Sequence, residues 1–310
     1  MASTHRLDAS QVHRAWNNAL APRLVVDPGD TVVFDTRDAA DFYYTRRSTH
    51  ADVLARGPFR GHPLTGPVSV RGARPGDVLV VDVHEVVPAL DFGWTAIRPG
   101  RGLLPEADFP KPYLQIWDVS DGKFARSERG IAVPIEAFPG VMGVALDEPG
   151  EHSTMPPRRS GGNMDIKQLV AGTRLYLPVL VEGALFSVGD AHAAQGDGEV
   201  CVTAVEMAAR VTVTFELEPP RGLREPQFRT PDTPRGARGR CFVTTAHGPD
   251  LFASSQQAIR YMIEHLVAER GLSREEAYIL SSVAVDLRIS EIVDAPNWIV
   301  SAFLPESVFP

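Results

Sequence analysis

Apolar and polar positions in the first two-thirds of the chain follow patterns that are typical of β-strands. Residues 78–83 are almost continuously apolar, which predicts a strand buried on both faces. Residues 211–218 alternate between apolar and polar side chains, as expected for a strand with one face in water. Two further short strands, 24–26 and 31–34, flank a Pro-Gly turn. The sequence therefore predicts many short strands joined by turns.

The period of the apolar pattern changes in the last quarter of the chain. Between residues 254 and 271, apolar side chains recur every three or four positions, which predicts a helix with one apolar stripe that ends at Gly271. Ser273 and Glu276 have the spacing of a capping box. We therefore expect a second helix over residues 274 to about 282.

A segment rich in Pro, Gly and Arg, residues 219–239, separates these two regions and indicates a weak boundary. The expected fold class is mainly β, with a β-rich body over residues 1–218 that carries the candidate site. A smaller C-terminal α+β portion, residues 219–310, is expected to pack on that body.

Composition and charge exclude several classes of protein. The 39 acidic residues outnumber the 31 basic ones, and a net charge of -8 repels phosphate backbones, so no nucleic-acid partner is expected. Cys201 and Cys241 form neither a disulfide framework nor a metal-type pair. The most apolar stretch, 175–186, is too short to span a bilayer, and no secretory signal is recognisable. We therefore expect a cytoplasmic protein without a membrane partner.

The richest candidate for chemistry is residues 189–199, which contain three carboxylates, a histidine and glycines that permit tight bends. In an extended chain, Asp190 and His192 project to one side, as do Asp197 and Glu199. Carboxylate oxygens and an imidazole together suit Zn²⁺ or a similar divalent ion. The alternative is a polar turn in which Asp and Gly serve the backbone geometry.

Three other segments offer weaker candidates. In residues 161–165, two glycines precede Asn163 and Asp165, although Asp165 could equally cap the turn that follows. Asp38 belongs to a group of aspartates after a predicted strand, where such groups are usually solvated. His62 lies in a rigid Pro-Gly turn, where a structural role is the simpler interpretation.

Two stretches, GGNMDIK (161–167) and GDAHAAQGDGEV (189–200), resemble the core signature of the acetamidase/formamidase family. The segment YLPVLVEGALFS (176–187) lies between them and extends the resemblance. Further matching stretches cover nearly the whole chain: residues 32–38, 62–67, Gly93-Trp94, and the closing segment 272–305.

This resemblance implies hydrolysis of a small aliphatic amide to a carboxylate and ammonia. It also implies a jelly-roll-like part and a small β-barrel in the body, and a homo-oligomer, either a dimer or a trimer. By position, the acidic and histidine cluster of the family falls on seven residues: Asp38, His62, Asp165, Asp190, His192, Asp197 and Glu199.

The expected mechanism uses a divalent ion, zinc first, to activate water and polarise the amide carbonyl, with one or two ions bound and Ca²⁺ possible at a second site. Metal binding is assigned to Asp38, Asp165, Asp190 and His192. Glu199 is assigned the transfer of the proton, and Asp197 assists as a further ligand or by orienting one. Substrate binding is assigned to Asn163 and Gln195 as donors to the oxyanion, Trp94 as a pocket wall, and His62.

Two alternatives remain open from the sequence. The same metal site could hydrolyse a lactam or another cyclic amide. A non-catalytic β-sandwich binding module could instead use the carboxylates to hold a structural Ca²⁺.

Overall fold

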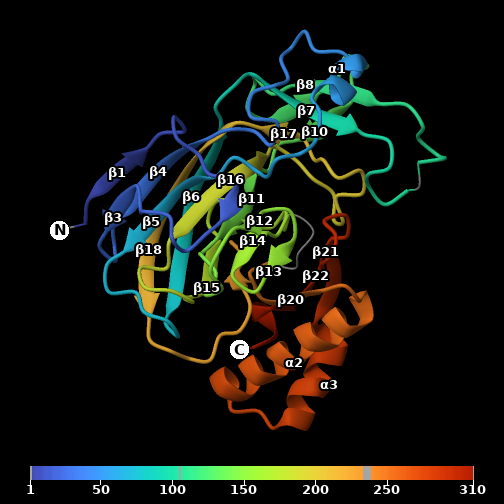
Figure 1. The fold of residues 1–310 in the computed structure, drawn as a ribbon. Helices are drawn as coiled ribbons and strands as arrows, with labels where there is room; N and C mark the ends of the chain where they lie inside the picture. Colours follow the sequence, from blue (N-terminus) through green and yellow to red (C-terminus); the bar gives the residue numbers. More distant parts are fainter. Residues whose placement is uncertain (1, 105, 233–238, 310) are drawn as a thin grey trace.

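Two large β-sheets form most of the molecule, and a pair of helices covers its C-terminal end (Figure 1). The structure is a computed structural model that describes residues 2–104, 106–232 and 239–309. The first sheet has nine strands, in the order β1 (Thr4–Leu7), β4 (Thr31–Thr36), β18 (Ala209–Glu218), β6 (Val78–Pro88), β15 (Arg174–Pro178), β19 (Gln227–Arg229), β20 (Cys241–Gly248), β22 (Trp298–Pro305) and β21 (Asp286–Glu291).

The second sheet has eleven strands and carries most of the candidate site. Its main path is β10 (Ala132–Pro134), β9 (Phe124–Arg126), β8 (Tyr113–Asp118), β7 (Phe92–Ile97), β17 (Glu206–Met207), β16 (Phe186–His192), β11 (Phe138–Gly143), β14 (Gly161–Asn163) and β13 (Pro157–Arg158). β5 (Thr65–Val70) and β3 (Leu24–Val26) join this sheet through β16. A two-stranded ribbon pairs β2 (Ala15–Trp16) with β12 (His152–Ser153), and a 3-10 turn, Glu306–Val308, follows β22.

The main core lies where the two sheets face each other. Phe34 and Phe215 belong to the nine-stranded sheet, and Phe186 belongs to β16 of the other sheet. All three rings are fully buried and meet edge to face, with centroids 5.1 to 6.5 Å apart. Edge-to-face aromatic contacts between facing sheets hold β16 against the core from one side.

The strand predictions are confirmed where the pattern is local. Residues 78–81 of β6 are buried, and β18 alternates between buried residues and more exposed threonine and glutamate positions. The turn at residues 27–30 does join two strands, but they belong to different sheets: β3 pairs in parallel with β5, whereas β4 pairs with β1 and β18.

Both C-terminal helices are confirmed. α2 (Leu251–Arg270) ends at Gly271, which has a φ of 65°, and α3 (Arg274–Ala284) begins with the capping box of Ser273 and Glu276. The buried face of α2 packs on β20 and β22. Across the described residues, no helix has an apolar stretch of membrane-spanning length.

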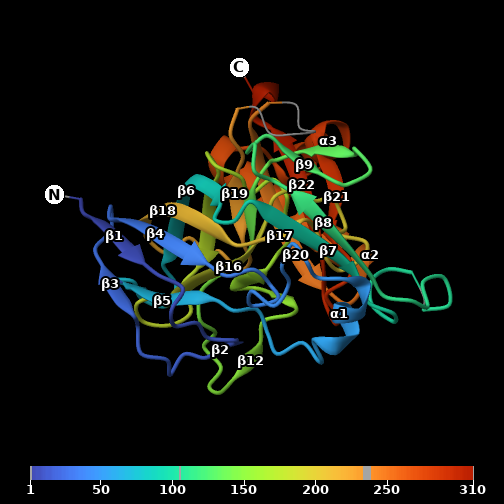
Figure 2. The ribbon, with the colours of Figure 1, turned by 90° about the horizontal axis from the view of Figure 1, so that it is seen from above.

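The mainly β class with a C-terminal α+β portion is therefore confirmed, with one correction. Among the described strands, neither large sheet closes on itself: the nine-stranded sheet runs from β1 to β21 as free edges, so the small barrel that the resemblance implies is not formed. Pairing of β15 with β19 also makes residues 219–310 an extension of the body's own sheet. A short helix, α1 (His50–Ala55), lies beside β8 (Figure 2). In Figure 1 it is at the opposite end of the molecule from α2 and α3.

Candidate active site

One cavity of about 130 Å³ collects most of the residues that the sequence singles out. Its polar lining includes one histidine, one asparagine and five carboxylates: His62, Asn163, Asp165, Asp190, Glu199, Glu206 and Asp294. Its apolar lining includes Val53, Phe59, Trp94, Ala96, Met155 and Val293. Apolar walls around a few convergent polar groups are the usual form of a small-molecule site.

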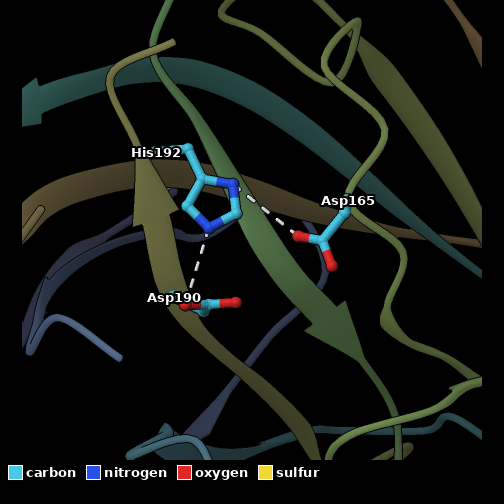
Figure 3. A group of neighbouring side chains, drawn as sticks. All are labelled: Asp165, Asp190 and His192. Atoms are coloured by element: carbon cyan, nitrogen blue, oxygen red, sulfur yellow. Dashed lines mark ion pairs between the residues drawn. The ribbon is translucent and has the colours of Figure 1, made fainter. Parts of the chain in front are cut away.

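His192 lies at the centre of the acidic group. It shares β16 with Asp190, and every residue of that strand is buried. The imidazole lies between two carboxylates in Figure 3: Nε2 is 3.6 Å from Oδ1 of Asp190, and Nδ1 is 3.7 Å from Oδ1 of Asp165. Carboxylate oxygens of Glu206 and Glu199 approach the same Nε2 at 3.3 and 3.9 Å. Four carboxylates therefore converge on one buried ring.

The two ring nitrogens of His192 differ in their partners. Nδ1 lies 2.9 Å from Oε1 of Gln195, and Nε2 of Gln195 donates to the carbonyl of Asp165 at 2.6 Å. The second bond sets the orientation of the Gln195 amide, so that its oxygen accepts a hydrogen from Nδ1. Within the described chain, Nε2 has no hydrogen-bond partner. A neutral His192 ring thus directs a free lone pair from Nε2 into the carboxylate group, as a metal ligand does.

The other donor atoms of this cluster fit a divalent cation. Both carboxyl oxygens of Asp165, Oδ1 of Asp190 and Oε2 of Glu206 are buried without a hydrogen-bond partner among the described residues. Buried carboxylate oxygens without donors are costly unless a cation compensates them. Three overlapping groups have ligand atoms within 4.8 Å of one another: Asp165, Asp190 and His192; His192, Glu199 and Glu206; Asp165, Glu199 and Asp294.

Burial, and after it the crowding of like charges, raises the pKa values of several carboxylates in the cluster when no cation is present. Burial raises the pKa of Glu206 to about 8 and that of Asp165 to about 6, and it raises the pKa of Glu199 well above its usual range. For His192, burial lowers the pKa, but Glu206 and Asp190 outweigh it and the pKa lies well above the usual value. The cluster therefore favours additional positive charge.

Local backbone geometry brings these side chains together. Asp165, Asp190 and Glu199 all have left-handed φ values, of 46°, 52° and 46°. Such conformations are unfavourable for residues with a side chain and concentrate at functional sites. Gly140 on β11 lies against the cluster so closely that a Cβ there would meet Cε1 of His192 at 2.9 Å. Only glycine fits at that position.

Asp197 is not part of the cluster. Its carboxylate forms ion pairs with Lys167 at 3.1 Å and Arg288 at 3.3 Å and is partly exposed. We expected Asp197 and Glu199 to project together from an extended segment, but Gly198 has a φ of 91° and Glu199 is left-handed. The chain turns between them, so Glu199 enters the cavity and Asp197 faces the ion pairs outside it.

Asp38 is buried but does not reach the metal-type groups. Its Oδ1 accepts from the backbone N–H of Ala40 at 2.7 Å, and burial raises its pKa to about 6. It appears in none of the three ligand groups and does not line the cavity. Trp94, by contrast, is part of the wall, where its ring lies 4.7 Å from that of Tyr44.

His62 and Asn163 both line the cavity. Nε2 of His62 lies 3.5 Å from Oδ2 of Asp190, so this histidine is next to a carboxylate of the cluster. Nδ2 of Asn163 donates to the Asp294 carboxylate and to the Met155 carbonyl, so its N–H groups are both engaged. Its Oδ1 is buried without a donor among the described residues and is free to accept.

Two members of the cluster, Glu206 and Asp294, receive no role in the sequence analysis. Glu206 is the only charged residue in the run Ala-Val-Glu-Met-Ala-Ala, and it pairs with Trp94 between β17 and β7. Asp294 comes from the loop between β21 and β22. An isolated acid in an apolar run is the signal that could have identified Glu206, whereas Asp294 depends on tertiary packing.

Comparison with known proteins gives a consistent result. The model of the Acetamidase/Formamidase family matches residues 2–150 and 148–310. A formamidase of Methylophilus methylotrophus is 29% identical over an alignment that covers 96% of this chain and 89% of the relative.

Two crystal structures have similar folds. An acetamidase from Bacillus halodurans has a TM-score of 0.87 and 32% identity, with 96% of each chain covered. A predicted acetamidase/formamidase from Thermoanaerobacter tengcongensis has a TM-score of 0.89 and 30% identity, with 99% of this chain and 97% of that one covered. The chain thus belongs to the acetamidase/formamidase family, a family of amidohydrolases.

Proposed function

We propose that this protein hydrolyses a small aliphatic amide to a carboxylate and ammonia, using a divalent metal ion held in the buried cluster. The observation that carries the proposal is the Nε2 atom of His192, which has no hydrogen-bond partner among the described residues and faces three carboxylates. The family supplies the reaction class, and the cavity of about 130 Å³ suits a substrate of a few heavy atoms.

Asp165, Asp190 and His192 would hold the metal, with Glu206 beside them. An imidazole among carboxylates favours zinc, whereas the oxygen-only group of Asp165, Glu199 and Asp294 would suit Ca²⁺ at a second site. When bound, a divalent ion polarises the amide carbonyl and acidifies water.

Glu199 is the residue we assign to proton transfer. It is buried, lines the cavity, and has a pKa raised first by burial and then by Asp165. A carboxylate with a raised pKa can accept a proton from the attacking water and return it to the departing nitrogen. The carbon–oxygen bond forms, the carbon–nitrogen bond breaks, and the proton leaves with ammonia.

The remaining cavity residues would position the amide. Asn163 Oδ1 can accept from the substrate N–H₂ group, because its own N–H groups are engaged by the protein. Trp94 closes the apolar side of the cavity, and His62 orients Asp190. Gln195 acts one step away, by holding the His192 ring rather than the oxyanion.

Ammonia release by the purified protein tests this proposal. The panel consists of formamide, acetamide and propionamide, assayed for ammonia, and γ-butyrolactam, assayed for 4-aminobutanoate because its ring opening releases no ammonia. Each substrate is assayed before chelation, after chelation, and after adding back Zn²⁺ or Ca²⁺. Metal content is measured in every sample. We expect activity on linear amides that falls with the metal and returns with Zn²⁺. Full activity without metal would refute the metal mechanism, and a preference for the lactam would favour the cyclic-amide alternative.

We also propose that the chain forms a homo-oligomer, a dimer or a trimer. Support comes from an apolar patch, defined as Tyr278, Ile279 and Val283 of α3 with Leu287 and Ile289 of the edge strand β21, all of which are exposed. Exposed apolar side chains beside the edge of a sheet are typical of an interface between chains, and among the described residues this edge is occupied only by Gly198, at Ser290 and Glu291.

A further inference from the structure

Three arginines line the same cavity as the acidic cluster. Arg56 caps the end of α1, and Arg98 and Arg101 lie in the turn after β7. The chain as a whole is acidic, with a net charge of -8. A neutral amide offers no group that needs cationic side chains, so their position calls for a physical reason.

Neither Arg56 nor Arg98 forms a direct ion pair among the described residues, although Arg56 lies near enough to the buried Asp38 to offset part of the rise that burial causes in the pKa of that carboxyl. Arg56 Nη2 donates to the carbonyl of Ala39 at 2.7 Å, and Arg98 Nη1 donates to the carbonyl of Gly57 at 2.6 Å. Both side chains are half-buried, and within the described parts of the chain neither forms an ion pair. A guanidinium has five N–H donors, so each arginine retains several that are held in place and unused.

These two cations lie on the Tyr44–Trp94 side of the cavity. Burial raises the pKa of the Tyr44 phenol, and Arg56 and Arg98 act against that rise, which places both guanidinium groups near it. The Tyr44 ring is 4.7 Å from that of Trp94, a wall residue. Arg56 and Arg98 therefore lie beside the apolar wall formed by Tyr44 and Trp94. The carboxylates around His192 form another part of the lining, which we call the acidic floor.

The acidic floor does not account for the arginines. The carboxylates of this floor, those of Asp165, Asp190, Glu199 and Glu206, approach the His192 ring, and none of them forms an ion pair with an arginine among the described residues. An anionic substrate would be repelled by this floor unless cations elsewhere in the cavity held its charge. Two half-buried arginines with free donors provide that attraction, and planar guanidinium groups match a carboxylate well.

We propose that Arg56 and Arg98 bind the carboxylate of a substrate that is the monoamide of a small dicarboxylic acid. The proposal rests on the proposed amidase function and names its substrate class. The substrate places its amide at the metal cluster and its carboxylate at the arginines. Water adds to the amide carbon, the carbon–nitrogen bond breaks, and the products are a dicarboxylate and ammonia. Arg101, which is exposed, lies at the outer side of the same cavity.

Paired substrates of similar shape test the proposal with the metal-loaded protein. Succinamate carries the carboxylate, 4-oxopentanamide replaces it with a neutral methyl ketone, and 3-aminopropanamide carries a positive charge. We expect the wild type to prefer succinamate over both others in kcat/KM. Arg98→Gln and Arg56→Gln should reduce the succinamate to 4-oxopentanamide ratio by roughly 10–100-fold, as expected for lost charged hydrogen bonds.

Arg47→Gln is the matched control, because Arg47 is an exposed arginine between β4 and α1 that does not line the cavity. It removes the same charge and should leave the ratio unchanged. Melting temperature and metal content verify folding, and Arg98→Lys, which keeps the charge but loses the planar fork, should give an intermediate ratio.

Two outcomes are separable. Ammonia release from all three amides without preference for succinamate would overturn the substrate class while leaving the amidase intact. If no amide is cleaved, calorimetric binding of succinate still decides: wild-type binding that weakens in Arg98→Gln but not in Arg47→Gln supports the anion site, and equal binding in all three overturns it.

Discussion

At the scale of single residues, the different partners of the two nitrogens of His192 explain how a neutral ring can serve a metal. Gln195 engages Nδ1, and this leaves Nε2 directed at Asp190, Glu199 and Glu206. The ring is also fixed from one side by Phe138, whose centroid lies 5.2 Å away in an edge-to-face contact. A ligand held in this way loses little entropy when an ion binds.

Replacement of the central ligands should remove metal and activity together. In His192→Ala and Asp190→Asn we expect metal content and ammonia release to fall by at least about tenfold, with the fold retained by circular dichroism. His84→Ala is the control, because His84 is exposed and bonds only to Thr214. Wild-type metal content in both cluster variants would show that these residues are not ligands.

Glu199→Gln separates proton transfer from metal binding. The amide keeps the shape of the side chain but cannot accept and return a proton, so turnover should drop by about 10²–10⁴-fold. Zinc content and melting temperature should stay near the wild-type values. Unchanged turnover would remove Glu199 from the mechanism, and loss of zinc would instead make Glu199 a zinc ligand.

Sequence reasoning located only part of the cluster, for a geometric reason. Asp190 and His192 lie two residues apart on one strand, β16, so their spacing predicted a shared site, although the left-handed φ of Asp190 makes the strand irregular at that residue. Asp197 and Glu199 have the same spacing, but the turn at Gly198 separates them. Asp294 reaches the site through packing between distant segments, which no local pattern encodes.

At the scale of elements, β11 lies so close to the cluster that one of its positions, Gly140, has no room for a side chain. A Cβ at Gly140 would lie 2.8 Å from the carbonyl oxygen of Asp190 and 2.9 Å from Cε1 of His192. The Asp190 carbonyl belongs to the backbone of β16, and the His192 ring is the proposed metal ligand at the centre of the cluster. Neither can move without disturbing the cluster.

Gly140→Ala should therefore damage the site. We expect reduced metal content and activity, and a loss of stability of about 1–3 kcal/mol from overpacking. The control is Gly196→Ala, where a Cβ would have no neighbour within 4 Å. Thermal unfolding, metal analysis and ammonia release on both variants check this; a Gly140→Ala protein with normal metal content would contradict the close contact.

Helix α2 carries a histidine that should make the stability of the protein depend on pH. The His265 ring stacks on Phe242 of β20 at 3.5 Å, and burial, followed by Arg229, lowers its pKa to about 3. The unfolded chain binds this proton near pH 6.5 and the folded chain does not. Stability is therefore complete above pH 6.5 and falls as the pH drops toward 3.

Between pH 8 and pH 5 this single group should cost about 2 kcal/mol of unfolding free energy. His265→Phe keeps an aromatic ring against Phe242 but cannot titrate. Between pH 8 and pH 5, the unfolding free energy of this variant should therefore fall by about 2 kcal/mol less than that of the wild type. Urea unfolding of both proteins at the two pH values measures the difference. Equal losses would mean that His265 is accessible to protons in the folded state.

Elements were more predictable than their pairing. The apolar periods of β6, β18 and α2 are local, and each was located from the sequence alone. Pairing joins distant segments, as when β5 and β17 both pair with the edge of β16 opposite to β11. The sequence carries no local record of such contacts, so the separation of β3 and β4 into different sheets could not be foreseen.

At the scale of the whole molecule, the exposed apolar patch on α3 and β21 bears on assembly. Val283 is 76% exposed and Ile279 is 66% exposed, values that are unfavourable for a monomer in water. Ile279→Glu combined with Val283→Glu should convert the proposed oligomer into monomers in sedimentation velocity. Val25→Glu on β3 places one such charge at another exposed apolar site and should leave the assembly unchanged. A wild type that sediments as a monomer would contradict the oligomer.

The loop that supplies Asp294 also sets an order of events during synthesis. Asp165, Asp190, Glu199 and Glu206 leave the ribosome first, and at roughly 5–20 residues per second Asp294 follows Glu206 several seconds later. During that interval the nascent chain has four of the five cavity carboxylates but not the carboxylate contributed from between β21 and β22. Under the proposed function, an ion bound during that interval would be held by His192 and the early carboxylates alone, before Asp294 joins them.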